Sequence, residues 1–184
     1  MERRGFLSLV GTSALGLLAS APAGASTARA LTLAELVGKS TSVVVATAVA
    51  KRSSWTTIGG ARRIVTDTRL KVEELVSGAD PSTTELVVRT LGGVVGEIGQ
   101  IVEGEAELTI GEQGMTFVTQ IDPAFYGVTA MGQGHYPITA DTRGRILRQN
   151  RQLPALVGNK ATAVATLRGR LVSDGLALVR AVRR

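Results

Sequence analysis

His135 is the only histidine of the chain and therefore the only imidazole that could serve as a general base. A Ser-His-Asp arrangement would need it, and Asp122, Asp141 and many serines could complete the set. The sequence lacks the Gly-x-Ser-x-Gly turn that presents the nucleophile in one large class of hydrolases. His135 lies at the edge of an expected strand, so we predict a structural or surface histidine rather than a catalytic one.

Glutamates are concentrated in one stretch, from Glu97 to Glu112. If this stretch is extended, Glu103, Glu105 and Glu107 share one face. Paired carboxylates can bind a hard cation such as calcium, or act as acid and base in glycoside hydrolysis. No Asp-rich loop with the spacing of a calcium site is present. The sequence therefore favours a solvated strand face, with a carboxylate-dependent extracytoplasmic hydrolase as the alternative.

Glycines and one tryptophan mark the two connections where we expect binding. Gly92, Gly93 and Gly96 belong to a run that lacks the Lys-Ser/Thr pair of a phosphate-binding loop, and no helix is expected after it. Such a run suits a sharp corner between short strands. Trp55, in a polar connection over residues 51–61, could anchor a partner or a sugar. Because binding on small barrels usually lies on connections, these residues are the predicted binding surface.

The composition limits the chemistry further. Without cysteine, the chain can form neither a disulfide nor a thiolate metal site, and it has no thiol nucleophile. The formal net charge of +6 is a mild excess that allows attraction to anionic surfaces but does not indicate nucleic-acid binding. No residue pattern predicts a cofactor.

The first 25 residues have the parts of a cleavable export signal: a basic start, a modestly apolar run and a stretch of small residues. Arg3 and Arg4 are followed after one residue by Phe6 and Leu7, as in twin-arginine signals. An ordinary secretory signal that happens to contain two arginines is the alternative. The apolar run is shorter than the roughly 20 residues that span a bilayer, so no stable membrane span is expected.

Ala23 and Ala25 supply small residues at the two positions that a signal peptidase reads. We therefore expect cleavage after Ala25, transient contact with the twin-arginine export machinery, and a periplasmic or extracellular location in a bacterium. The remaining chain, residues 26–184, is predicted to form one domain.

The elements that would position the candidate residues are mostly strands. Residues 32–39 indicate a short helix, with Thr32 as N-cap and Glu35 as its capping-box partner. Residues 42–50 are almost continuously apolar and β-branched, which indicates a buried strand, whereas residues 62–76 alternate as in a half-exposed strand. Further strands are expected over 85–91, 115–121, 125–131, 134–140 and 146–150, and a C-terminal helix over 173–183 with Ser173 as N-cap.

This pattern predicts a mainly β protein, a small antiparallel barrel of the oligonucleotide/oligosaccharide-binding (OB) type with a short N-terminal helix and a C-terminal helix. The order of elements resembles netrin-like barrels, which include tissue inhibitors of metalloproteinases. Those inhibitors use an N-terminal cysteine to reach the protease metal, and this chain has none.

About half of the chain also resembles a widespread group of uncharacterised exported bacterial proteins. The likeness rests on a helix followed by six pieces: a valine-rich strand, a tryptophan-containing loop, a long strand, a Gly-Gly bend, a stretch that begins with Val-x-Gly and ends with Gly-Glu, and a Gly-x-x-Gln-Gly-like turn. These pieces are Val43 to Val49, Trp55, Thr66 to Gly78, Gly92 to Gly96, Val102 to Glu112 and Met131 to Gly134. The likeness implies export but no particular activity.

From these observations we expect an exported, non-enzymatic binding or interaction module whose partner is an envelope or extracellular protein or a glycan. The carboxylate-dependent hydrolase is one alternative. An extracellular protease inhibitor is another, and it follows only from the likeness in fold.

Overall fold

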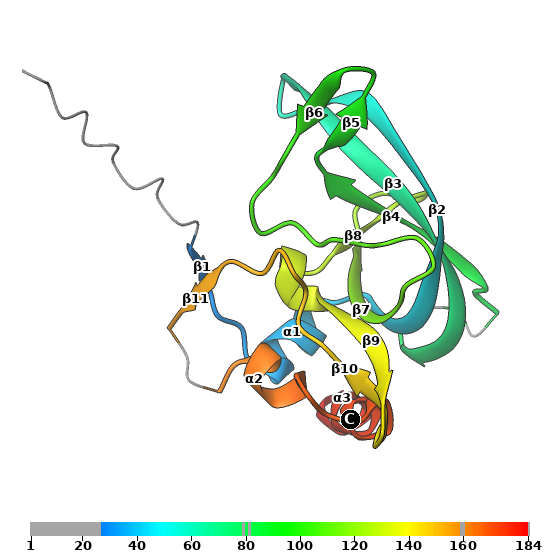
Figure 1. Ribbon diagram of the computed structural model, residues 1–184, viewed down its shortest axis with the longest axis vertical. Coiled ribbons are helices and arrows are strands. Elements are labelled where there is room, and N and C mark those ends of the chain that lie inside the picture. Colours follow the sequence, from blue (N-terminus) through cyan, green and yellow to red (C-terminus); the bar gives the residue numbers. More distant parts are fainter. Residues whose placement is uncertain (1–26, 79, 81, 159–160, 184) are drawn as a thin grey trace, which may run out of the picture.

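The computed structural model describes residues 27–78, 80, 82–158 and 161–183. The predicted export signal, with Arg3, Arg4, Phe6, Leu7, Ala23 and Ala25, lies outside the described residues. The described part is mainly β, as predicted. Its helices α1 (Leu33–Lys39), α2 (Ala163–Leu167) and α3 (Val172–Val182) gather at the end of the molecule opposite to the hairpin of β5 (Gly93–Val95) and β6 (Ile98–Gln100) (Figure 1).

Helix α1 begins where its local sequence predicts. The hydroxyl of Thr32 accepts a hydrogen bond from the Glu35 backbone N–H, and the Glu35 carboxylate accepts one from the Thr32 backbone N–H. This reciprocal pair satisfies two N–H groups that have no partner inside the helix. Leu33, Leu36 and Val37 are buried and turn the helix toward the sheet.

Strand β2 (Ser42–Ile58) begins with a segment that is buried on both faces, which explains its continuous apolar sequence. Val43 and Val45 pack into a cluster shared with the helices. Val44, Ala46 and Ala48 point the other way, into a second cluster formed largely by strands. The first half of β2 thus separates two hydrophobic cores.

The prediction of a polar connection over residues 51–61 is wrong. Strand β2 continues to Ile58 and pairs along its length with β3 (Ala61–Ser77), so the connection shrinks to Gly59 and Gly60. Both glycines have positive φ angles, 58° and 80°, as the tightest hairpin turns require. Most residues of this segment are exposed or half-buried, because the ribbon extends past the other strands of the sheet toward its turn.

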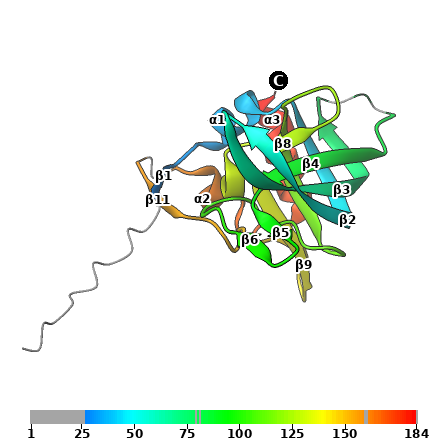
Figure 2. The ribbon, with the colours of Figure 1, turned by 90° about the horizontal axis from the view of Figure 1, so that it is seen from above.

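Seven strands form the main sheet, in the order β10-β9-β7-β2-β3-β4-β8. Strand β7 also pairs with β8, so the pairings from β7 through β2, β3, β4 and β8 return to the strand at which they started. The β4–β8 pairing is parallel and the others in this ring are antiparallel. Figure 2 shows the same strands from above. The bounds not yet given are β4 (Glu85–Leu91), β7 (Gln113–Gln120), β8 (Tyr126–Val128), β9 (His135–Asp141) and β10 (Gly144–Leu147).

The ends of the described chain lie against this sheet and its helices. Strand β1 (Thr27–Arg29) pairs in parallel with β11 (Ala155–Val157), and a short 3₁₀ helix, η1 (Met131–Gly134), precedes β9. The C-terminal helix is present, but its N-cap is Leu171 rather than the predicted Ser173. Arg180 pairs with Glu74 at 2.6 Å and so fastens α3 to β3. Among the described residues, no helix is long and apolar enough to cross a membrane.

Candidate functional site

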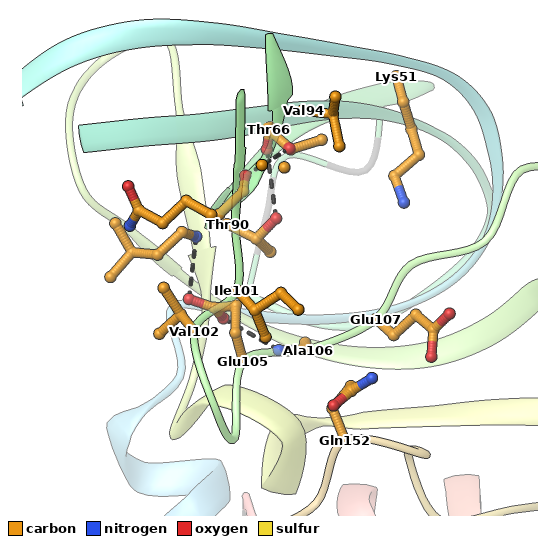
Figure 3. Close-up of a pocket in the computed structure, with 15 residues that line it drawn as sticks. Lys51, Thr66, Thr90, Val94, Ile101, Val102, Glu105, Ala106, Glu107 and Gln152 are labelled. Carbon is orange, nitrogen blue, oxygen red and sulfur yellow. Dashed lines mark hydrogen bonds between the residues drawn. The ribbon is translucent and has the colours of Figure 1, made fainter. Parts of the chain in front are cut away.

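The glycine bend after β4 forms one wall of a pocket of about 430 Å³, as the close-up shows (Figure 3). The residues from 101 to 107, which we call the strap, run across the pocket from β6 toward β7. Leu91, Val94 and Ile101 give the pocket apolar walls, and Lys51 reaches into it from β2. The remaining lining residues are Thr66, Thr90, Gly92, Gly93, Gly99, Gln100, Val102, Glu105, Ala106, Glu107 and Gln152. We call this site the strap pocket.

Position 93 requires a glycine because β5 packs there directly against side chains of β2 and β3. Its φ angle is +131°, and a Cβ atom there would collide with Thr66 Oγ1 and lie 2.5 Å from Ser53 Oγ. Those two hydroxyls are hydrogen-bonded to each other at 2.9 Å, and Thr66 Oγ1 also lies 2.7 Å from the Gly92 carbonyl oxygen. The bend is therefore pressed onto β2 and β3, which agrees with the corner predicted from the glycine run.

The predicted binding surface is divided by the structure. Gly92 and Gly93 line the strap pocket, whereas Gly96 lies in the turn between β5 and β6 and is not among the lining residues. Trp55 lies on β2 rather than in a loop, and it too is outside the pocket lining. Arg62 stacks on the Trp55 ring, with its guanidinium carbon 4.8 Å from the ring centroid.

Glu105 has a structural role at the pocket wall. One carboxylate oxygen accepts a hydrogen bond from the Leu91 backbone N–H and the other from the Ala106 backbone N–H, both at 3.0 Å. The first bond ties the strap to the end of β4. Burial raises the pKa of the Glu105 carboxyl, and the two N–H donors act in the opposite direction. The prediction of a solvated strand face is thus wrong for Glu105, because the N–H of Leu91 in β4 and that of Ala106 in the strap itself take the place of water.

The other strap glutamates follow the predicted alternation. Glu103 is exposed and Glu107 half-buried, while the alternate residues Gly104, Ala106 and Leu108 are buried. Glu105 and Glu107 both line the strap pocket, as the hydrolase alternative requires of two carboxylates. Their carboxylates point apart, however, with Glu105 directed toward β4 (Figure 3). Among the described residues, no cluster of three histidine, aspartate or glutamate side chains could hold a metal ion.

His135 is buried, is not among the strap pocket lining residues, and packs in a structural role, one of the two roles predicted for it. Its Nδ1 lies 2.9 Å from the Thr116 hydroxyl, and its ring fills the space beside Gly114, where a Cβ atom could not fit. Burial lowers the pKa of His135 from 6.5 to about 4, so the ring is neutral at physiological pH.

Sequence reasoning missed Lys51, Gln100 and Gln152 as lining residues. Lys51 comes from the middle of β2, and Gln152 lies about 50 residues beyond Gln100 in the chain. The Gln100 side chain accepts a hydrogen bond from the Ile64 backbone N–H at 3.0 Å, which fixes β6 to β3. No local pattern marks such residues, because only the folded chain brings them together.

No protein-family model and no curated protein matches the chain. The function is therefore argued from the strap pocket and from the surfaces around it.

Proposed function

We propose that this protein is an exported, non-enzymatic binding module whose ligand occupies the strap pocket. The observation that carries the proposal is the composition of that pocket: apolar walls, a glycine backbone, and a half-buried glutamate whose two oxygens already accept backbone hydrogen bonds. A carboxylate held in this way is poorly placed to exchange protons with a substrate. Lys51 and Glu107 remain as polar groups that would orient a ligand with apolar surface.

The fold that we propose for this module is a five-stranded OB-type barrel. The ring of pairings through β2, β3, β4, β8 and β7 supports it, as does the single parallel pair within that ring. Helix α1 would then pack beside the barrel, where its buried face contributes to the core shared with α2 and α3.

Export is proposed from the sequence alone. Arg3 and Arg4, followed by Phe6 and Leu7, support transport through the twin-arginine machinery, and Ala23 and Ala25 support cleavage after residue 25. Replacing both arginines by lysine in the producing bacterium should leave the protein in the cytoplasm. N-terminal sequencing of the exported wild-type protein should begin at Ser26. Export of the Lys-Lys variant at the wild-type level would contradict the twin-arginine proposal.

The hydrolase has one observation in its favour, the raised pKa of Glu105 in a pocket that Glu107 also lines. We place it second because the Glu105 oxygens are engaged. The protease-inhibitor alternative rests on strand order alone, which does not specify function.

A pull-down from the envelope and medium of the producing bacterium tests the binding proposal. The bait is the full-length wild-type protein, compared with Gly99→Leu, because a side chain at Gly99 would begin at ordinary contact distance, 3.8 Å, from Val94 Cγ2 and would fill part of the pocket. Ala165→Leu, on the exposed part of α2, is the matched control. We expect one stoichiometric protein or glycan with wild type and control, and its loss with Gly99→Leu.

Equal recovery by all three baits would refute the strap pocket as the binding site. Turnover of a glycan or ester by wild type that is abolished in Glu107→Gln would instead favour the hydrolase.

A further inference from the structure

We infer that the distal half of the β2–β3 hairpin docks onto an anionic phospholipid surface. The ribbon from residue 51 to residue 64, which we call the arm, carries nine uncharged residues between two pairs of cations. Its sequence is Lys-Arg, then Ser-Ser-Trp-Thr-Thr-Ile-Gly-Gly-Ala, then Arg-Arg-Ile, with no acidic residue. This surface is separate from the strap pocket, apart from Lys51, and the inference does not depend on the proposed ligand.

The cations of the arm are available for an external partner. Arg52, Arg62 and Arg63 are exposed, and within the described residues none of them forms an ion pair. The register places Arg62 opposite Thr57 and Arg63 opposite Thr56, so the two side chains leave opposite faces of the ribbon just behind its tip. Cations on both faces of a narrow tip suit a flat, extended anionic surface better than a single bound anion.

The acidic groups nearby are already engaged. Asp67 holds Arg89 through two hydrogen bonds of 2.7 and 2.8 Å. Asp122 accepts backbone N–H groups of Ala124 and Phe125. Asp67 lies opposite Arg52 in the strand register but is paired with Arg89, and within the described residues no carboxylate forms an ion pair with Arg52, Arg62 or Arg63. The arm therefore carries cations that complement an anionic surface.

The tip itself is apolar. Ile58 is 42% exposed, and it lines a hollow of about 170 Å³ together with two other exposed apolar side chains, Ile121 and Met131. Trp55 lies three residues, or about 10 Å, behind Ile58 along the strand and is 36% exposed. Figure 1 shows the arm at the end of the molecule opposite to the helices, so no helix obstructs its approach to a surface.

This layering matches the depth profile of a bilayer surface. Aliphatic side chains favour the acyl boundary, arginines pair with lipid phosphates, and tryptophan favours the headgroup level. Nucleic acid fits less well, because Arg62 covers one face of the only tryptophan and the remaining exposed apolar groups of the tip cannot stack on bases.

Trp55 provides a site-specific assay, since it is the only tryptophan of the chain. The full chain is titrated with vesicles of phosphatidylglycerol, or of phosphatidylcholine alone, at low salt. We expect a blue shift of tryptophan emission, and quenching by lipids brominated on the acyl chain, with phosphatidylglycerol only. Binding of the N-terminal 25 residues to vesicles would not by itself change the environment of Trp55.

Arg52→Gln/Arg63→Gln leaves the stacked Arg62 in place and should raise the lipid concentration needed for half of the shift roughly 25-fold, at about fivefold per cation. Arg151→Gln/Arg168→Gln removes two exposed cations elsewhere and should change it less than about twofold. Ile58→Ser should reduce acyl-chain quenching, whereas Val157→Ser, at another exposed apolar residue, should not.

A blue shift that is equal with both lipids, equal weakening by the two arginine pairs, or no shift in wild type would overturn the inference. Displacement from phosphatidylglycerol vesicles by a DNA oligonucleotide at equal phosphate concentration would also overturn it, in favour of nucleic acid. A Gly99→Leu variant that loses its pulled-down ligand but keeps the lipid-induced shift would show that the arm and the strap pocket act separately.

Discussion

The buried histidine makes a specific prediction about stability and pH. His135 is the only histidine, it is 4% exposed, and its burial holds the pKa at about 4 against an ordinary value of 6.5. Between these two values the unfolded chain binds a proton that the folded protein does not. The free energy of unfolding should therefore be undiminished above pH 6.5 and should fall as the pH drops toward 4.

The size of the effect follows from the two pKa values. Each pKa unit corresponds to about 1.4 kcal/mol, so the full loss is about 3 kcal/mol. About 2 kcal/mol of it should be lost between pH 8 and pH 5, before most carboxylates titrate. This is a large fraction of the stability of an ordinary domain.

Urea unfolding of wild type and His135→Gln at several pH values between 8 and 5 measures this effect. Glutamine stays neutral and can still hydrogen-bond Thr116, so the variant should lose much less stability over this range than wild type. Glu105, with a raised pKa, acts in the opposite sense, since its folded state binds the proton more tightly and stability falls as the pH rises above 4.5. Both proteins contain Glu105, so the difference between their free energies of unfolding at each pH reports the contribution of His135 alone.

The reasoning fails if wild type and His135→Gln lose the same stability between pH 8 and pH 5. An independent check is the pH titration of the single histidine ring by NMR. A ring that titrates near pH 6.5 in the folded protein would contradict the burial argument, whatever the unfolding curves show.

Three further predictions concern two residues that shape the strap pocket, Gly93 and Glu105, and the ion pair of Arg89 with Asp67. Gly93→Ala should lower the free energy of unfolding by about 3 kcal/mol, because a Cβ atom at this position would collide with Thr66 and Ser53. Gly96→Ala should lower it by only about 1 kcal/mol, because Gly96 has a positive φ angle but lies in open space. Similar urea midpoints for the two variants would contradict the close packing of Gly93 against β2 and β3. Glu105→Gln should lose one of the two hydrogen bonds that the side chain accepts from backbone N–H groups, because an amide has only one acceptor oxygen. The free energy of unfolding measured in urea should fall by about 1–3 kcal/mol, and an unchanged midpoint would contradict this prediction. Arg89→Lys should lose the two hydrogen bonds to Asp67 and the stacking on Phe125, whose ring centroid lies 3.6 Å from the guanidinium carbon. We expect the free energy of unfolding to fall by about 1 kcal/mol, measured by thermal unfolding. An unchanged melting temperature would show that a positive charge alone is enough to stabilise this site.

Local sequence accounts for the elements whose stabilising contacts lie close together along the chain. The capping box of Thr32 and Glu35 spans three residues, and it starts α1 as predicted. The continuous apolar start of β2 indicates a segment buried on both faces. The alternation of apolar and polar residues in β3 indicates a strand with one buried face. These features depend on residues that lie a few positions apart in the chain.

The length of the β2–β3 hairpin could not be predicted in the same way. Residues 51–58 are mostly polar because most of this segment is exposed or half-buried, and a polar stretch followed by glycines has the same composition whether it is a loop or an exposed ribbon. Backbone pairing with β3, which side-chain pattern does not record, decides between the two.

The candidate site was determined by tertiary structure. Sequence identified the glycine bend and the alternating glutamates, but not that Glu105 would meet the Leu91 N–H or that Lys51 and Gln152 would face the same pocket. Those contacts join residues 14 to about 100 positions apart, and only the ring of strand pairings sets the distances between them. For this chain, the sequence determined where α1 begins and which faces of the first half of β2 and of β3 are buried. The strand pairings decided how far β2 extends and which side chains share a site, because they join residues that are distant in the chain.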